Sequence, residues 1–199
     1  MYKKQFEIFD KEDSERFSDE GINLFVGSSS IRRWETITED MSPKKVLNRG
    51  FGGSTMEQLI LFHERLILRY KFKKIFIYEG DNDIGKKRNK IDIVLQQFKK
   101  LEKIIHTHQP DAQINFLSIK CSPYKKGNCK TYKIANKIFE EYCQSENYLN
   151  FIDISFGFLD ENNNIKSKFF NETDGIHPSL EGYKYLTKLL KPYLYPQDF

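Results

Sequence analysis

INLFVGSSS (residues 22–30) indicates the fold class most clearly, because a short, mostly apolar run passes directly into a glycine and three small polar residues. A run of four to eight apolar residues that ends in turn residues is typical of a strand buried on both faces of a sheet. The first strand is therefore expected at 22–27. Similar runs predict four more strands, at 45–48, 74–80, 113–119 and 150–154.

The segments between these runs have the apolar period of helices. Apolar residues recur on one helical face in four segments, at 56–67, 91–105, 134–142 and 180–190. Ser54 and Glu57 have the S-x-x-E spacing of a capping box, so a helix should begin just after the preceding glycines. Alternation of strands and helices predicts an α/β fold, with a mostly parallel sheet covered by helices on both faces.

Length and charge limit the possible classes of protein. The chain has 199 residues, which fits one domain, and we expect residues 1–20 to form an N-terminal extension that packs on it. Charged residues make up 30% of the chain, but the net charge is only +4 and no block of five like charges occurs. This pattern argues against nucleic-acid binding. No apolar run approaches 18 residues, so no segment is expected to span a membrane.

The three cysteines, Cys121, Cys129 and Cys143, lack the spacing of a metal site. The N-terminal stretch MYKKQFEIFDKED has no apolar core of the kind found in signal peptides. We therefore expect three reduced thiols and a cytoplasmic location.

Unusual polar blocks follow the predicted strands. GSSS (27–30) follows the first strand, NRGFGGS (48–54) the second and EGDND (79–83) the third, while DGIH (174–177) lies just before the last helix. In an open α/β sheet, ligands bind beyond the carboxyl ends of the strands. We therefore expect the four blocks to converge on one site.

The DGIH block suggests a general base. Asp174 lies three residues before His177 and, in a turn, can accept the imidazole Nδ1–H. Nε2 is then free to take a proton from a serine brought in from elsewhere.

The serines of the first block supply the candidate nucleophile. At a strand-to-helix turn, the serine N–H and the helix N-terminus can stabilise an oxyanion. The same position equally suits a helix N-cap. Residue chemistry alone does not choose among Ser28, Ser29 and Ser30.

The four blocks, in this order and at these distances, resemble the signature blocks of the SGNH (GDSL-type) hydrolase superfamily. The chain is most similar to the branch related to platelet-activating-factor acetylhydrolase, over about residues 22–194. The resemblance implies a flavodoxin-like, three-layer α/β/α sandwich with a parallel five-stranded sheet. It also implies an ester hydrolase without a metal or organic cofactor.

The resemblance assigns roles to five residues. Ser29 would be the nucleophile, His177 the general base and Asp174 the carboxylate that orients it. Gly53 would donate its backbone N–H, and Asn82 its side-chain NH₂, to the oxyanion.

Several positions also have simpler interpretations. Gly53 fits an ordinary turn, Asn82 fits an Asx-turn, and Glu79 receives no role. Asp81 and Asp83 are residue types that bind divalent cations, but no further ligands with suitable spacing accompany them, so we expect no metal. The family's usual Asp in the serine block is replaced here by Ser28, which affects local hydrogen bonding rather than the triad.

The sequence therefore predicts a serine hydrolase that removes acetyl or other short acyl groups from a small-molecule ester of a lipid, sugar or small alcohol. Lysophospholipid and thioester cleavage remain open within the same chemistry. One rival is a non-catalytic binding module, supported only by Ser28. Another is a phosphate or nucleotide binder that uses FGG before a helix, but GxGxxG and GxxxxGK[ST] are both missing.

Overall fold

A parallel sheet of five strands forms the centre of the protein, in the order β2-β1-β3-β4-β5. The computed structural model describes residues 2–15, 21–85 and 90–195. The strands are β1 (Ile22–Gly27), β2 (Val46–Gly50), β3 (Phe72–Tyr78), β4 (Gln113–Leu117) and β5 (Leu149–Ile152). This order is that of flavodoxin-like folds and confirms the predicted fold class.

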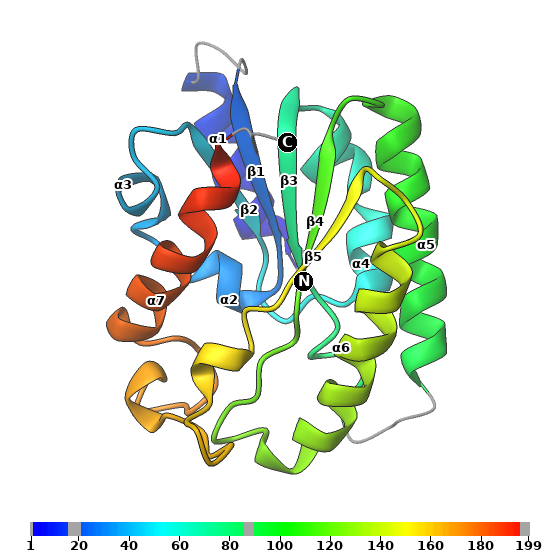
Figure 1. Ribbon diagram of the computed structural model, residues 1–199. Helices are drawn as coiled ribbons and strands as arrows, with labels where there is room; N and C mark the ends of the chain where they lie inside the picture. The colour runs from blue at the N-terminus through cyan, green and yellow to red at the C-terminus, as the bar shows by residue number, and fades with distance from the viewer. Residues whose placement is uncertain (1, 16–20, 86–89, 196–199) are drawn as a thin grey trace.

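Helices cover both faces of the sheet. Figure 1 shows α2, α3 and α7 on one side of the strands, with α4, α5 and α6 on the other. The α-helices are α1 (Lys3–Glu15), α2 (Ser29–Arg32), α3 (Ile37–Asp40), α4 (Met56–Leu61), α5 (Ile91–His108), α6 (Cys129–Cys143) and α7 (Leu180–Leu190). A π-helical turn, η1 (Glu64–Leu68), follows α4, and 3-10 turns η3 (Lys126–Asn128), η4 (Phe156–Phe158), η5 (Ser167–Phe169) and η6 (Lys191–Leu194) lie in the second half.

The alternation of β1 side chains produces two hydrophobic clusters. Leu24 and Val26 pack with residues of α1, α4, α5 and α6, whereas Phe25 packs with residues of α2, α3 and α7. Successive side chains of a strand point to opposite faces, so a strand between two helical layers needs apolar residues at nearly every position. Residues 22–26 meet this requirement at every position except Asn23, which is polar and buried.

Helix α1 places the N-terminal residues against the sheet. Phe6 and Phe9 are buried in the same cluster as Leu24. Arg49 of β2 is 1% exposed and forms ion pairs with Glu12 and Asp13 of α1. The sequence predicted an extension over residues 1–20 that packs on the domain, without a helix in it; residues 1 and 16–20 of that range lie outside the described residues.

Helix α4 begins at Met56, just after the glycines as predicted, but its capping residues and its C-terminal end differ from the prediction. Its N-cap is Thr55, whose side chain accepts the Gln58 N–H, while the Gln58 side chain accepts the Thr55 N–H. The predicted pairing of Ser54 with Glu57 is wrong, because the Ser54 hydroxyl donates to Glu79 instead. The single helical face expected at 56–67 is divided between α4 and η1.

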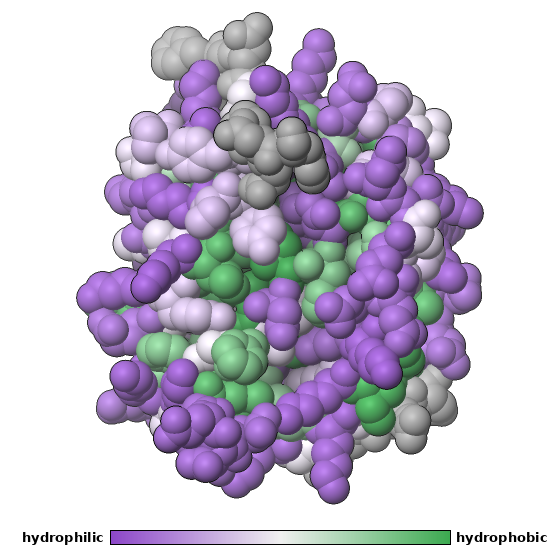
Figure 2. Space-filling model, viewed as in Figure 1, coloured by the Kyte–Doolittle hydropathy of each residue, from purple (hydrophilic) through white to green (hydrophobic). Residues whose placement is uncertain are grey.

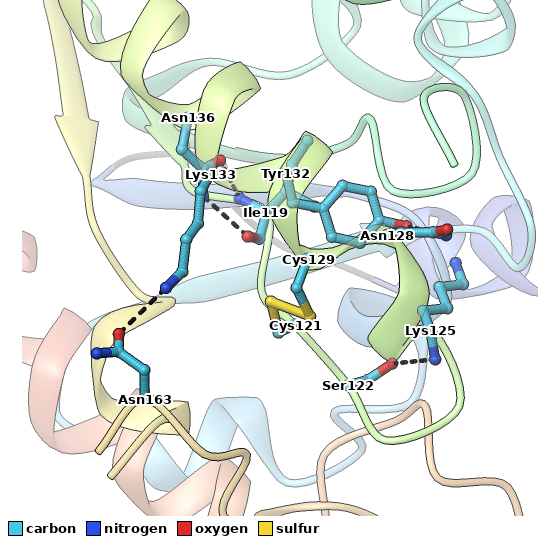
Figure 3. The surroundings of a disulfide bond; sticks show 10 residues. All are labelled: Ile119, Cys121, Ser122, Lys125, Asn128, Cys129, Tyr132, Lys133, Asn136 and Asn163. Atoms are coloured by element: carbon cyan, nitrogen blue, oxygen red, sulfur yellow. Dashed lines mark hydrogen bonds between the residues drawn. A yellow bond between two sulfur atoms is a disulfide. The ribbon is translucent and has the colours of Figure 1, made fainter. Parts of the chain in front are cut away.

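The expectation of three reduced thiols is wrong for two of the cysteines. Cys121 and Cys129 form a disulfide with their Cα atoms 5.3 Å apart, and Cys143 is free and buried. The chain turns back between β4 and α6 and so brings the two together (Figure 3). Cys121 and Cys129 are eight positions apart in the sequence, and that spacing alone does not predict such a turn.

The outer surface is mostly polar. Hydrophilic residues cover most of the face shown in Figure 2, and apolar residues gather near its centre. Of the described helices, none combines the length and the apolar character needed to cross a bilayer.

Candidate functional site

The candidate site lies where the strands end. Ser29 begins α2 directly after β1, Gly53 follows β2, and Asn82 follows β3. The turn that carries Asp174 and His177 comes just before α7. The sheet thus brings all four polar blocks to one edge.

Three of the predicted residues form one hydrogen-bonded row. The Ser29 Oγ lies 2.8 Å from His177 Nε2, although 148 positions separate the two residues. His177 Nδ1 lies 2.8 Å from Asp174 Oδ2. This arrangement has the order hydroxyl, imidazole, carboxylate that activates a serine for attack on a carbonyl.

Burial and hydrogen bonding distinguish Ser29 from its two neighbours. Ser28 and Ser30 are 0% and 5% exposed, whereas Ser29 is half-buried. The Ser28 hydroxyl donates to Asp81 Oδ1 at 3.3 Å, and Ser30 Oγ accepts from the Lys120 ammonium at 3.0 Å. Of the three serines, Ser29 is the one whose hydroxyl lies within hydrogen-bond distance of the His177 imidazole. This geometry favours Ser29, the serine to which the resemblance also points, as the candidate nucleophile.

Asp174 is held as a carboxylate. Burial alone would raise the pKa of Asp174, but hydrogen bonds from the His177 and Ile176 backbone N–H groups and from the His177 ring lower it well below its ordinary value. Arg33 also donates to Asp174 Oδ2, at 2.8 Å. The group beside the imidazole is therefore anionic at neutral pH.

His177 is held neutral. Burial lowers the pKa of His177, and the positive charges of Arg33 and Lys120 lower it further, against the opposing hydrogen bond to Asp174. With Nδ1–H donated to the carboxylate, the lone pair of Nε2 points to Ser29. The ring is therefore arranged to accept the proton of the serine hydroxyl.

Gly53 and Asn82 lie on adjacent loops. Both residues are exposed, and Asn82 Nδ2 donates to the Ser54 carbonyl at 2.9 Å. Gly53 has a φ of +75°, a backbone conformation that favours glycine. The amide of Asn82 has two N–H groups, and Ser54 takes one of them.

Two buried carboxyl groups support these loops. Glu79, which received no role in the sequence analysis, accepts a hydrogen bond from the Ser54 hydroxyl, and Asp83 Oδ1 accepts one from the Met56 N–H at 3.0 Å. Burial raises the pKa of Asp83 to about 6 and that of Glu79 well above its ordinary value. Across the described ranges, no three His, Cys, Asp or Glu side chains gather as metal ligands would.

Sequence reasoning missed three cations at the site. Arg33 pairs with Asp174, Lys125 pairs with Asp81, and Lys120 donates to Ser30 and to the Tyr78 hydroxyl. Lys120 is 3% exposed, and burial lowers its pKa to about 8. Its position just after a predicted strand was a usable signal, whereas single arginines and lysines in loops carry none.

Residues of the candidate site are accessible from the surface: Ser29 is half-buried, and Gly53 and Asn82 are exposed. A cavity of about 520 Å³ lies elsewhere, against α1 and β2, and its lining does not include Ser29, Asp174 or His177. The hydrogen-bonded row and the exposed Gly53 and Asn82, rather than the depth of a cavity, identify the candidate site.

Comparison with known proteins finds a matching family model. The GDSL-like Lipase/Acylhydrolase family matches residues 18–185. No curated protein matches the sequence.

Solved structures share the fold. A candidate platelet activating factor from Streptococcus pneumonia has a TM-score of 0.85 at 24% identity, over 97% of this chain and 92% of that one. A GDSL-like lipase from Bacteroides thetaiotaomicron has a TM-score of 0.78 at 17% identity, over 95% and 96%. A catalytic mutant of an acetylxylan esterase from Geobacillus stearothermophilus has a TM-score of 0.70 at 15% identity, over 91% and 97%.

Proposed function

The chain belongs to the GDSL-like lipase/acylhydrolase family, and on that basis we propose that it is a serine ester hydrolase that works through an acyl-enzyme intermediate. The observation that carries the proposal is the 2.8 Å contact between Ser29 Oγ and His177 Nε2. The anionic Asp174 behind the imidazole and the neutral state of His177 both support it.

The proposed reaction has two steps. Ser29 Oγ bonds to the ester carbonyl carbon while its proton passes to His177 Nε2, and the imidazolium then protonates the departing alcohol. Water, deprotonated by the same nitrogen, releases the acid from Ser29. In both steps Gly53 N–H and the free N–H of Asn82 stabilise the oxyanion.

Replacing Asn82 by alanine should lower kcat by about 10²–10³, because one oxyanion donor is lost. KM should change little, since the charge on the carbonyl oxygen develops mainly in the transition state. Steady-state kinetics on a p-nitrophenyl ester measure both constants. Asn162→Ala, on an exposed loop, is the matched control. If Asn82→Ala raised KM but kept the wild-type kcat, Asn82 would not be an oxyanion donor.

The acid limb of the pH profile should report His177. A protonated imidazole cannot accept the serine proton, so kcat/KM should fall as the pH drops through the pKa of His177, which lies below the ordinary value of about 6.5. Arg33→Gln should move this midpoint upward, because a positive charge that disfavours the imidazolium is removed. A rate that does not fall at any acidic pH at which the protein stays folded, or an acid limb that does not move in Arg33→Gln, would argue against His177 as the base.

We propose short acyl groups, above all acetyl, as the substrate class, carried by a sugar, lipid or small alcohol. The exposure of Gly53 and Asn82 and the fold shared with an acetylxylan esterase support this choice. The test is a panel of p-nitrophenyl esters from acetyl to palmitoyl, with acetylated xylo-oligosaccharides, a lysophospholipid and an acyl thioester. The acetyl compounds should give the highest kcat/KM. Preference for the lysophospholipid or the thioester would favour those activities instead, and no turnover of any compound would favour a binding module.

The cytoplasmic location remains a prediction. One of its grounds, the reduced state of the cysteines, does not hold for Cys121 and Cys129, and disulfides persist mainly in oxidising compartments. Cell fractionation, followed by an esterase assay that compares wild type with Ser29→Ala, would locate the protein.

A further inference from the structure

One loop connects the two halves of the candidate site. Residues 122–128 run between Cys121 and Cys129, and the disulfide joins the two ends of the loop (Figure 3). The Tyr124 N–H donates to the Gly175 carbonyl at 3.0 Å, inside the turn that carries Asp174 and His177. The next residue, Lys125, reaches the block that carries Asn82.

The Lys125 ammonium binds three oxygen atoms of that block. It lies 2.9 Å from Asp81 Oδ2, 3.3 Å from the Asp81 carbonyl and 3.1 Å from Asn82 Oδ1. The Lys125 side chain is 17% exposed, so the ammonium is largely removed from water. The Asp81 carboxylate balances its charge.

Further hydrogen bonds keep the loop in place. The Lys125 backbone N–H donates to Ser122 Oγ at 3.3 Å, and the Tyr132 hydroxyl of α6 donates to the Asp81 carbonyl at 2.9 Å. Asn136 of α6 bonds both the N–H and the carbonyl of Ile119, just before the loop. These hydrogen bonds hold the backbone that positions the Lys125 side chain beside Asn82.

We propose that Lys125 is a positioning residue for Asn82, which it fixes with the amide nitrogen toward the oxyanion. The proposal rests on the ester hydrolase function above. An asparagine amide can rotate by half a turn and exchange its oxygen and its NH₂ group. The Lys125 ammonium can only donate hydrogen bonds, so the amide must turn its oxygen toward it. The Ser54 carbonyl can only accept hydrogen bonds, so the amide must turn its nitrogen toward it. Both contacts select the same orientation.

The charge of Lys125 should also strengthen the donor. A hydrogen bond from a cation to the amide oxygen polarises the amide and makes its N–H groups more positive. The second N–H of Asn82 then bonds an oxyanion more tightly, without a charge of its own in contact with the substrate.

A double-mutant cycle tests the role in catalysis. Lys125→Met should lower kcat by about 10-fold and leave KM nearly unchanged, a smaller loss than that of Asn82→Ala because the amide itself remains. Lys125→Arg, which keeps a donor-only cation, should recover part of the rate. Lys126→Met makes the same change at the next, exposed position and should match wild type.

The cycle separates positioning from a general structural effect. In the Asn82→Ala background, Lys125→Met should cause no further loss of kcat, because the residue through which it acts is gone. A full additional loss in that background, or wild-type kcat in the single variant, would overturn the proposal.

A measurement without turnover keeps the two proposals distinguishable. The side-chain amide of Asn82 should give ¹H–¹⁵N resonances well separated from those of free asparagine in wild type, and Lys125→Met should move them toward the free values. Unchanged resonances would overturn the positioning role whatever the activity. If the wild-type protein hydrolysed no ester but Lys125→Met still moved the Asn82 resonances as expected, only the hydrolase function would be wrong.

Discussion

Replacing Ser29 by alanine should lower kcat by on the order of 10⁶, by analogy with the loss of a serine-protease nucleophile. The reason is geometric, since the Ser29 oxygen is the one placed 2.8 Å from His177 Nε2. Without it no acyl-enzyme forms, and only the background reaction of water remains. Burst and steady-state kinetics with p-nitrophenyl acetate measure the loss.

Ser30→Ala is the matched control for this variant. The substitution removes a serine hydroxyl at the adjacent position. Ser30, however, is 5% exposed, and its hydroxyl accepts a hydrogen bond from Lys120. It should lower kcat far less than Ser29→Ala. If the two variants lost equal activity, or if Ser29→Ala kept its burst of p-nitrophenol, the assignment of the nucleophile would be wrong.

Replacing Asp174 by asparagine should lower kcat by about 10⁴, as the corresponding change does in a serine-protease triad. Asp174 accepts hydrogen bonds on both oxygens, from two backbone N–H groups on Oδ1 and from His177 and Arg33 on Oδ2. An amide must turn its NH₂ toward one of these sets of donors. The imidazole then loses its fixed tautomer, and the serine loses its proton acceptor.

Glu172→Gln is the control for Asp174→Asn. It makes the same change of carboxylate to amide two residues earlier, at an exposed position, and should leave kcat unchanged. A loss in Asp174→Asn no larger than that of the control would mean that the carboxylate does not orient the base.

The sheet and the convergence of the site were predictable from local patterns. The apolar run at 22–27 has the length and composition of a strand buried on both faces, and β1 has the predicted bounds. Because parallel strands deliver their carboxyl ends to one edge, the polar blocks after them had to converge. The spacing of Asp174 and His177 is short enough for the turn itself to set their contact.

Contacts between side chains from distant loops were not predictable in this way. Arg33 donates a hydrogen bond to Asp174, 141 positions away in the sequence, and Lys125 donates one to Asp81, 44 positions away. In the sequence, Arg33 and Lys125 look like any other exposed cation in a loop. Residue chemistry alone also could not choose among Ser28, Ser29 and Ser30; the resemblance pointed to Ser29, and the burial and hydrogen-bond partners of the three serines in the fold favour the same residue. The disulfide belongs to the same class, since it depends on how the chain turns between β4 and α6.

Covalent labelling of the nucleophile tests the central claim most directly. A fluorophosphonate should react so that Ser29 Oγ bonds to phosphorus, fluoride leaves, and His177 takes the serine proton. Fragmentation mass spectrometry should place the adduct on Ser29, and His177→Ala should abolish the label. A label on Ser28, Ser30 or any other residue, or undiminished labelling without His177, would contradict the account.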